Sequence, residues 1–271
     1  MASLPITPAA ISLTYPYRLP SSTSHYPSPP LLIVENPKHK VPTQEKGAKA
    51  LADLPFSELE TECLRQLATP HPCHTLAKDN ATKEQLQLTL AGNYQLLHFS
   101  GHGMYDASVP AQSCLFLSGA DRFTLIDIVQ QDLRHLRLVT LAACETAITG
   151  NETITDEYIG LVSAFLSAGA KYVLSTLWRV ESEASMVLIV EFYRNLSHQV
   201  PPAEALQQAQ GFLATANRQT LHNWFTDAIS LVSDPVMQVL LRERQEFFAQ
   251  PGPDYPFSHP YFWSPFTLTS L

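Results

Sequence analysis

The stretch LLHFSGHGMYD, residues 96–106, joins a strand-like apolar segment directly to a histidine that lies between two glycines. A short apolar run that is bounded by glycine is typical of a buried strand. Glycine on both sides of His102 disfavours regular structure there, because glycine loses more backbone entropy on folding than other residues. The stretch therefore predicts a strand that ends in a turn carrying His102, and it raises the question of what this histidine does.

A second apolar run, RLVTLAACETA (137–147), carries Cys144 at its end. One helix and one hairpin are predicted between the two runs, which is what a right-handed crossover between neighbouring parallel strands needs. In an open α/β sheet, reactive side chains collect outside the carboxyl ends of the strands. We therefore expect His102 and Cys144 to meet at the same edge of one sheet.

The remaining pattern alternates short apolar runs with longer amphipathic ones, and it predicts a mostly parallel sheet covered by helices on both faces. Two pairs have the spacing of helix capping boxes, Ser57 with Glu60 and Thr82 with Gln85. We expect a helix stop at Gly169 and a first helical turn at Pro202. Beside the two strands above, further strands are predicted at 31–35 and 171–178, and a hairpin is predicted at 113–125 with its turn at 119–121. The predicted helices are 57–68, 82–92, 126–136, 156–169, 181–196 and 202–216.

Composition narrows the class of protein. The chain has 271 residues, 45% hydrophobic and 15% charged, which suits one large globular domain or two small ones. A net charge of -8 argues against nucleic acid as a partner, since phosphate contacts need clustered lysine and arginine. Four scattered cysteines without a CxxC pair predict neither a disulfide framework nor a zinc site. The sequence has no uninterrupted apolar run of about 18 residues, the length that would predict a membrane span. The first residues also lack signal-peptide features, so we expect a cytoplasmic protein.

Proline marks both ends of the chain. Residues 18–30, RLPSSTSHYPSPP, are typical of an extended, poorly ordered segment, and a second proline cluster at 251–260 predicts an extended path there. We divide the chain into a Pro/Ser-rich lead-in at 1–30, or the remnant of a longer N-terminal part, and a folded domain at 31–271.

A cysteine and a histidine at one sheet edge suggest nucleophilic catalysis. A thiolate is a strong nucleophile, and a nearby imidazole both lowers the pKa of a thiol and protonates a leaving amine. The backbone N–H groups of Gly103 and Cys144 would then form an oxyanion hole. Gly101 would allow a sharp bend and a close approach of substrate backbone.

Simpler interpretations stay open for these residues. Cys144 can be an inert core thiol, and His102 can hydrogen-bond a loop. His98, His102 and Asp106 are spaced four residues apart, so on a helix their side chains would lie on one face and could bind a metal ion. The two glycines beside His102 disfavour a helix there, so we predict no metal site. We interpret His98 as a hydrogen-bonded core residue. GxSxG, P-loop and GxGxxG motifs are absent, which removes the usual hydrolase, NTPase and dinucleotide classes.

Five blocks together resemble the CHAT domain family, which comprises caspase-like cysteine peptidases related to separases and often fused to tetratricopeptide repeats. The resemblance implies an α/β fold, a caspase-like three-layer α/β/α sandwich with a mostly parallel central sheet. It implies a cysteine endopeptidase that acts through a His–Cys dyad without a cofactor, with regulatory proteolysis as its role. The family's histidine falls on His102 and its nucleophile on Cys144, and its oxyanion donors fall on Gly103 and Cys144. The five blocks are LLHFSGHGMYD, SCLFLSG, LVTLAACETA, DEYIGLVSAFLSAGAKYVLSTLWRV and HPYFWSPFTL.

Two departures from the family pattern bear on specificity and partners. The family's WxVDD is WRVESE here, which places Glu181 and Ser182 at the two acidic positions. The specificity-pocket candidates are Glu145, Asp156, Trp178 and Glu181, and a carboxylate there would select a substrate arginine or lysine; Asp156 can equally be a helix N-cap. A further element that precedes the first strand in the family is missing, which would leave an open edge for a regulatory protein partner.

The expected partners are a protein or peptide substrate and a regulatory protein, with neither nucleic acid nor membrane. A rival hypothesis is a catalytically silent caspase-like interaction or signalling module. A third is a zymogen-like state that a partner activates.

Overall fold

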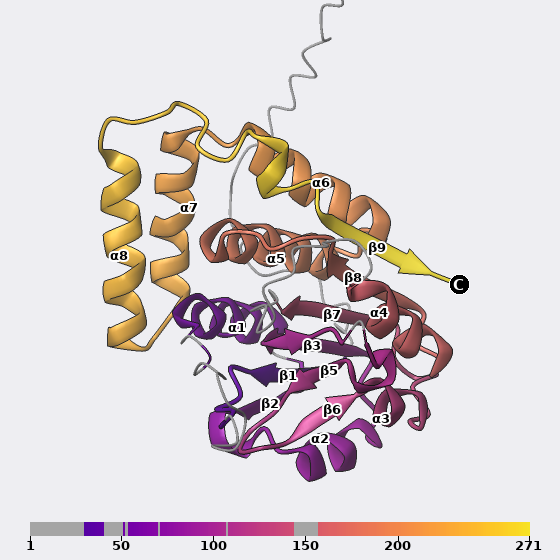
Figure 1. Ribbon diagram of the computed structural model, residues 1–271. Coiled ribbons are helices and arrows are strands. Elements are labelled where there is room, and N and C mark those ends of the chain that lie inside the picture. The colour runs from indigo at the N-terminus through magenta and orange to yellow at the C-terminus, as the bar shows by residue number, and fades with distance from the viewer. Residues whose placement is uncertain (1–29, 41–50, 52–53, 70, 107, 144–156) are drawn as a thin grey trace, which may run out of the picture.

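The structure is a computed structural model that describes residues 30–40, 51, 54–69, 71–106, 108–143 and 157–271. Its centre is a six-stranded sheet with the strand order β2-β1-β3-β7-β8-β9 (Figure 1). Five of these strands run parallel, and β9 pairs antiparallel with β8 at one edge. The strands are β1 (Leu31–Glu35), β2 (Cys73–Ala77), β3 (Leu96–Gly101), β7 (Leu138–Ala143), β8 (Tyr172–Thr176) and β9 (Phe266–Ser270).

A second, three-stranded antiparallel sheet follows β3 directly. It consists of β4 (Gly103–Met104), β5 (Cys114–Phe116) and β6 (Arg122–Thr124), in the order β4-β5-β6. The predicted hairpin is confirmed, and Gly119 takes the positive φ of +67° that its turn requires. This small sheet fixes the chain immediately after His102.

Helices cover both faces of the central sheet, which confirms the predicted three-layer α/β/α sandwich (Figure 1). One layer contains α1 (Pro55–Ala68), α5 (Ser182–Ser197), α6 (Pro202–Thr215), α7 (Arg218–Leu231) and α8 (Pro235–Ala249). The other contains α2 (Lys83–Leu90), α3 (Leu125–Val129) and α4 (Glu157–Ser167). Three short 3₁₀ turns lie at Lys78–Asn80, Pro110–Gln112 and Pro260–Phe262.

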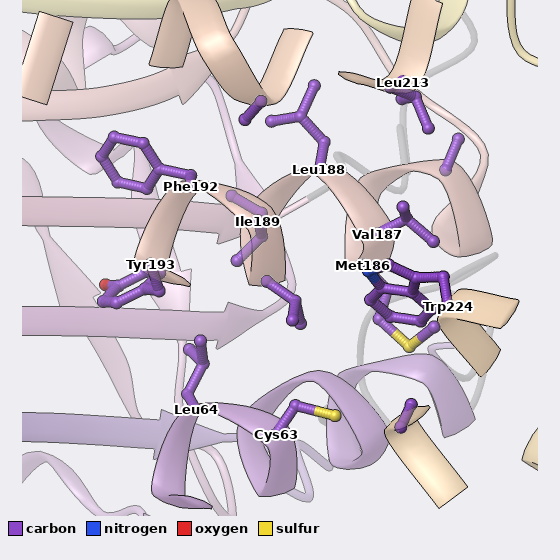
Figure 2. Close-up of a cluster of buried hydrophobic side chains, with 14 of the residues drawn as sticks. Cys63, Leu64, Met186, Val187, Leu188, Ile189, Phe192, Tyr193, Leu213 and Trp224 are labelled. Atoms are coloured by element: carbon purple, nitrogen blue, oxygen red, sulfur yellow. The ribbon is translucent and has the colours of Figure 1, made fainter. Parts of the chain in front are cut away.

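Strand alternation divides the apolar residues between two cores. Leu31 and Ile33 of β1 belong to the core under α1 and α5, whereas Leu32 and Val34 belong to the core under α2, α3 and α4. Figure 2 shows the first of these cores, where Leu64 on α1 points toward α5. All five residues of β1 are buried, as expected for a strand covered on both faces.

Several predicted helix ends are confirmed. The Thr82 hydroxyl accepts from the N–H of Gln85 at the start of α2, Pro202 occupies the first turn of α6, and Gly169 follows α4 with φ of +108°. The capping box predicted at Ser57 is wrong. α1 begins at Pro55 with Leu54 as its N-cap, because proline is already suited to a first helical turn.

The sequence interpretation missed β2 and the two helices α7 and α8. The hairpin of α7 and α8 lies at the left of Figure 1, next to α1 and α5. It adds Trp224, Phe225 and Phe248 to the core under α1 and α5. The part of the chain described here contains no helix that is long and apolar enough to cross a membrane.

Candidate active site

The ends of β3 and β7 lie side by side in the central sheet. The two strands pair in parallel, and their register matches Gly101 to Ala143, the last residue of each strand. The next residues along the chain are His102 and Cys144. Cys144 lies outside the described residues, as do Glu145 and Asp156, so their predicted roles stay predictions.

His102 lies in the short connection between β3 and β4 and is 3% exposed. Its backbone carbonyl accepts a hydrogen bond from the N–H of Phe116 at 2.9 Å. The last residue of β3 and the first residue of β4 therefore flank His102 directly, which restricts where its side chain can lie.

Gly103 begins β4 and pairs with Leu115 of β5. The bond from the Phe116 N–H to the His102 carbonyl flanks this pair, so Gly103 and Leu115 form a non-hydrogen-bonded pair of the antiparallel ladder. In such a pair the N–H groups point away from the opposite strand. The N–H of Gly103 is thus directed away from β5, as an oxyanion donor requires.

Gly101 has a packing reason for being glycine. A Cβ there would lie 2.9 Å from the Phe99 ring and 3.0 Å from Cδ of Pro37, closer than such atoms approach. The described glycines with positive φ are Gly119 and Gly169, so Gly101 does not use the left-handed region. Close packing at the end of β3, rather than a left-handed bend, accounts for this glycine.

His98 is fully buried, which confirms it as a hydrogen-bonded core residue. Its Nε2 lies 2.9 Å from Oε1 of Glu60 on α1, and its ring packs edge-on against Tyr193 at 5.5 Å between centroids. Its Nδ1 is buried and has no hydrogen-bond partner among the described residues. A protonated ring would bury an unbonded N–H at this atom, so the pattern favours a neutral ring that donates from Nε2 to Glu60.

The three described cysteines are poor nucleophiles. Burial raises the pKa of Cys63 to about 12 and that of Cys114 to about 11. Burial also raises the pKa of Cys73 above its ordinary value. At neutral pH all three are thiols rather than thiolates, which are the reactive form.

A cavity of about 50 Å³ opens at the carboxyl ends of the strands, on the face that α1 and α5 cover. The strands contribute Ser100 and Gly101 from β3, Ala142 from β7, Thr176 from β8 and Phe266 from β9. The cavity therefore begins beside the two strand ends that His102 and Cys144 follow in the chain.

The helices complete the lining of this cavity. The start of α1 provides a wall, and Glu60 lies one turn further along the helix; α5 contributes the opposite wall. The lining residues are Leu54, Phe56, Ser57 and Glu60 on the α1 side and Ser182, Ser185 and Ile189 on the α5 side.

The two described specificity candidates do not line this cavity. Trp178 follows β8, is partly buried against the core under α1 and α5, and donates from Nε1 to the carbonyl of Tyr261 at 3.2 Å. Glu181 is exposed at the N-cap position of α5, and its side chain makes no capping hydrogen bond. Neither residue is among those that line the cavity.

Glu60 and Ser185 of the cavity were missed at the sequence level. Glu60 was assigned to a capping box, although it precedes Leu64 by four residues and so shares the buried face of its helix. That spacing was the available signal for a buried carboxylate. Ser185 gave no signal, because a serine in the first turns of a helix is common on exposed faces.

Comparison with protein families decides the assignment of the chain. A model of the CHAT domain matches residues 6–270, nearly the whole chain. The chain belongs to the CHAT domain family. The resemblance carried by the five sequence blocks is thereby confirmed. A comparison of this CHAT domain with curated proteins gave no match.

Several solved structures are similar to this CHAT domain at low identity. The complex of the pro- and mature domains of RgpB from Porphyromonas gingivalis has a TM-score of 0.41 and 11% identity, and covers 66% of this chain and 42% of that one. The Arg-specific cysteine proteinase gingipain R has a TM-score of 0.39 and 12% identity, covering 66% and 41%. A pyridoxal kinase from Staphylococcus aureus has a TM-score of 0.31 and 10% identity, covering 69% and 87%. The CHAT domain spans about two fifths of the length of the two gingipain chains.

Proposed function

We propose that this CHAT domain is a cysteine endopeptidase with Cys144 as the nucleophile and His102 as the general acid and base. The observation that carries the proposal is the register of β3 with β7. Because Gly101 and Ala143 are paired, the two reactive residues follow immediately after neighbouring positions at the same edge of the sheet.

In the proposed reaction, the thiolate of Cys144 attacks the peptide carbonyl and forms a tetrahedral oxyanion. The N–H of Gly103, which points away from β5, and the N–H of Cys144 stabilise the negative charge. His102 protonates the departing amine, and a thioester remains. Water then hydrolyses the thioester and regenerates the thiol. Regulatory proteolysis is the proposed role, with a protein substrate and a regulatory protein as partners.

The properties of the other cysteines support Cys144 as the nucleophile. Cys63, Cys73 and Cys114 all have raised pKa values because they are buried. We therefore expect iodoacetamide at pH 7.5 to alkylate Cys144 in the folded protein before the other three. Mass spectrometry of the digested protein measures this order, and equal labelling of Cys63 and Cys144 would contradict the proposal.

Turnover tests the dyad directly. We expect His102→Ala and Cys144→Ala each to lower kcat/KM on a peptide library by a thousandfold or more, as roughly observed when members of such catalytic units are removed. Cys114→Ser is the matched control, since this thiol is buried in the small sheet and is expected to leave turnover within a fewfold of wild type. Full activity in both dyad variants would refute the proposal.

A further inference from the structure

The cavity at the strand ends combines apolar walls with polar atoms that lack partners. Phe56, Ile189 and Phe266 contribute apolar wall, and the buried Oγ of Ser185 has no hydrogen-bond partner in the described part of the chain. Glu60 is 4% exposed and uses Oε1 to accept from His98. No hydrogen bond to its Oε2 is recorded among the described residues. A cavity with apolar walls, a carboxylate and an unbonded hydroxyl is suited to an aliphatic stem with a donor at its tip.

Among the described residues, Glu60 forms no ion pair with a lysine or an arginine, and its basic neighbour is His98. The hydrogen bonds of His98 favour its neutral form, as argued above, so this ring donates a hydrogen bond without balancing the charge. Arg65 binds Glu35 and Glu62, and Arg194 binds Glu191. A buried carboxylate without a cation is unfavourable, and a cationic ligand in the cavity would relieve this state.

The size of the cavity limits which cation it can take. A volume of about 50 Å³ corresponds to roughly four water-sized positions. The end of a lysine side chain is slim and unbranched, whereas the planar fork of arginine is wider. An aspartate would bring a second negative charge to Glu60. The ammonium of lysine has three donors, which match Glu60, Ser185 and one further hydroxyl of the lining.

We propose that this cavity is the primary specificity pocket and that it binds a lysine side chain, with Glu60 as the residue that selects the charge. The meaning of the pocket as a substrate subsite rests on the peptidase function proposed above. The location supports it, because Gly101 and Ala142 of the lining lie next to the strand ends that precede His102 and Cys144. In this proposal, the charge preference comes from Glu60 on α1.

Cleavage gives the first test. The wild-type protein is assayed with a peptide library in which only the residue before the scissile bond is fixed, as lysine, norleucine, arginine or aspartate. Norleucine has the chain of lysine with a methyl group in place of the ammonium. We expect kcat/KM to favour lysine over norleucine by roughly ten- to hundredfold, the range of a charged hydrogen bond, and to favour lysine over arginine.

Variants assign this preference to the pocket. Glu60→Gln keeps the shape and the acceptor for His98 but removes the charge, so the ratio for lysine over norleucine is expected to fall close to one. Ser185→Ala is expected to lower the ratio severalfold and serves if Glu60→Gln fails to fold. The matched control is Glu58→Gln on the same helix, whose carboxylate binds Asn36 and Lys78 outside the cavity, and it is expected to leave the ratio unchanged.

A binding test separates this inference from the proposed function. N-acetyl-lysine amide and N-acetyl-norleucine amide are compared by ligand-observed NMR with the 271-residue chain carrying Cys144→Ala, which needs no turnover. Preferential binding of the lysine probe that is lost in Glu60→Gln supports the pocket even if no peptide is cleaved. Three outcomes would overturn the proposed pocket: cleavage without a preference for lysine, a lysine preference that survives both pocket variants, or equal binding of the two probes. In the first two cases the proposed peptidase function stands.

Discussion

Burial controls the protonation of Cys63, which lies in the core under α1 and α5. Cys63 is fully buried on α1, and the loss of water around it raises its pKa from 9.0 to about 12. The folded protein therefore holds this proton at pH values where the unfolded chain releases it. The stability that follows is complete below pH 9 and is lost as the pH rises from 9 toward 12.

This linkage gives a residue-scale prediction. We expect the free energy of unfolding of wild type to fall more steeply between pH 9 and pH 11 than that of Cys63→Ala, by up to about 1.4 kcal/mol per pH unit. Urea unfolding at several pH values measures both slopes. Leu64→Ala is the control, because it removes volume from the same core without removing a titrating group; a Cys63→Ala slope equal to that of wild type would contradict the assigned cause.

Glu60 illustrates how far a local pattern reaches. The spacing of Ser57 and Glu60 fits a capping box, yet the chain begins the helix two residues earlier at Pro55. Glu60 instead meets His98, which is 38 residues away in sequence. Local sequence patterns span only a few residues, far fewer than the 38 that separate Glu60 from His98. The sequence therefore predicted a polar contact for His98 but not the identity of its partner.

Among the described elements, a partly buried charge pair joins α8 to α5. Arg244 donates from Nε and Nη2 to the two oxygens of Glu183, both at 2.7 Å, and its guanidinium lies 4.4 Å from the centroid of the Phe247 ring. Burial raises the pKa of Glu183 above its ordinary value. Burial disfavours the charged carboxylate, and the contact with Arg244 favours it.

Removing one partner of this pair tests the effect of that contact. We expect Arg244→Leu to destabilise the protein by about 3 kcal/mol, because Glu183 is left buried without a cation. The double variant Arg244→Leu, Glu183→Leu is expected to recover most of the loss, since no isolated charge remains. Urea unfolding measures both. A double variant as unstable as the single one would mean that packing of Arg244 on Phe247, rather than charge, holds α8 in place.

Two cores share one sheet at the scale of the whole molecule. β1 contributes Ile33 to the core under α1 and α5 and Leu32 to the core on the opposite face. All three tryptophans report on the first core: Trp224 belongs to it, and Trp178 and Trp263 pack against it. Since the same strands line both cores, we expect the two to unfold together.

Leu32→Ala tests this cooperativity, because Leu32 is fully buried in the core that contains no tryptophan. We expect it to lower stability by about 2–5 kcal/mol. Tryptophan fluorescence and circular dichroism are both expected to report the same lowered midpoint in urea. An unchanged fluorescence midpoint with a shifted circular-dichroism midpoint would show that the two faces unfold separately.

The sequence by itself indicated most of the elements, though not β2, α7 or α8, and it indicated the two residues of the proposed dyad. Apolar runs of strand length, helix ends such as Pro202, and the glycines around His102 are local signals, and the family blocks place them in order. Tertiary structure alone decided what meets at the strand ends. The register of Gly101 with Ala143, the contact of Glu60 with His98 and the cavity between α1 and α5 join segments that are far apart in the chain. Such contacts depend on packing across the sheet, and no periodicity along the sequence encodes them.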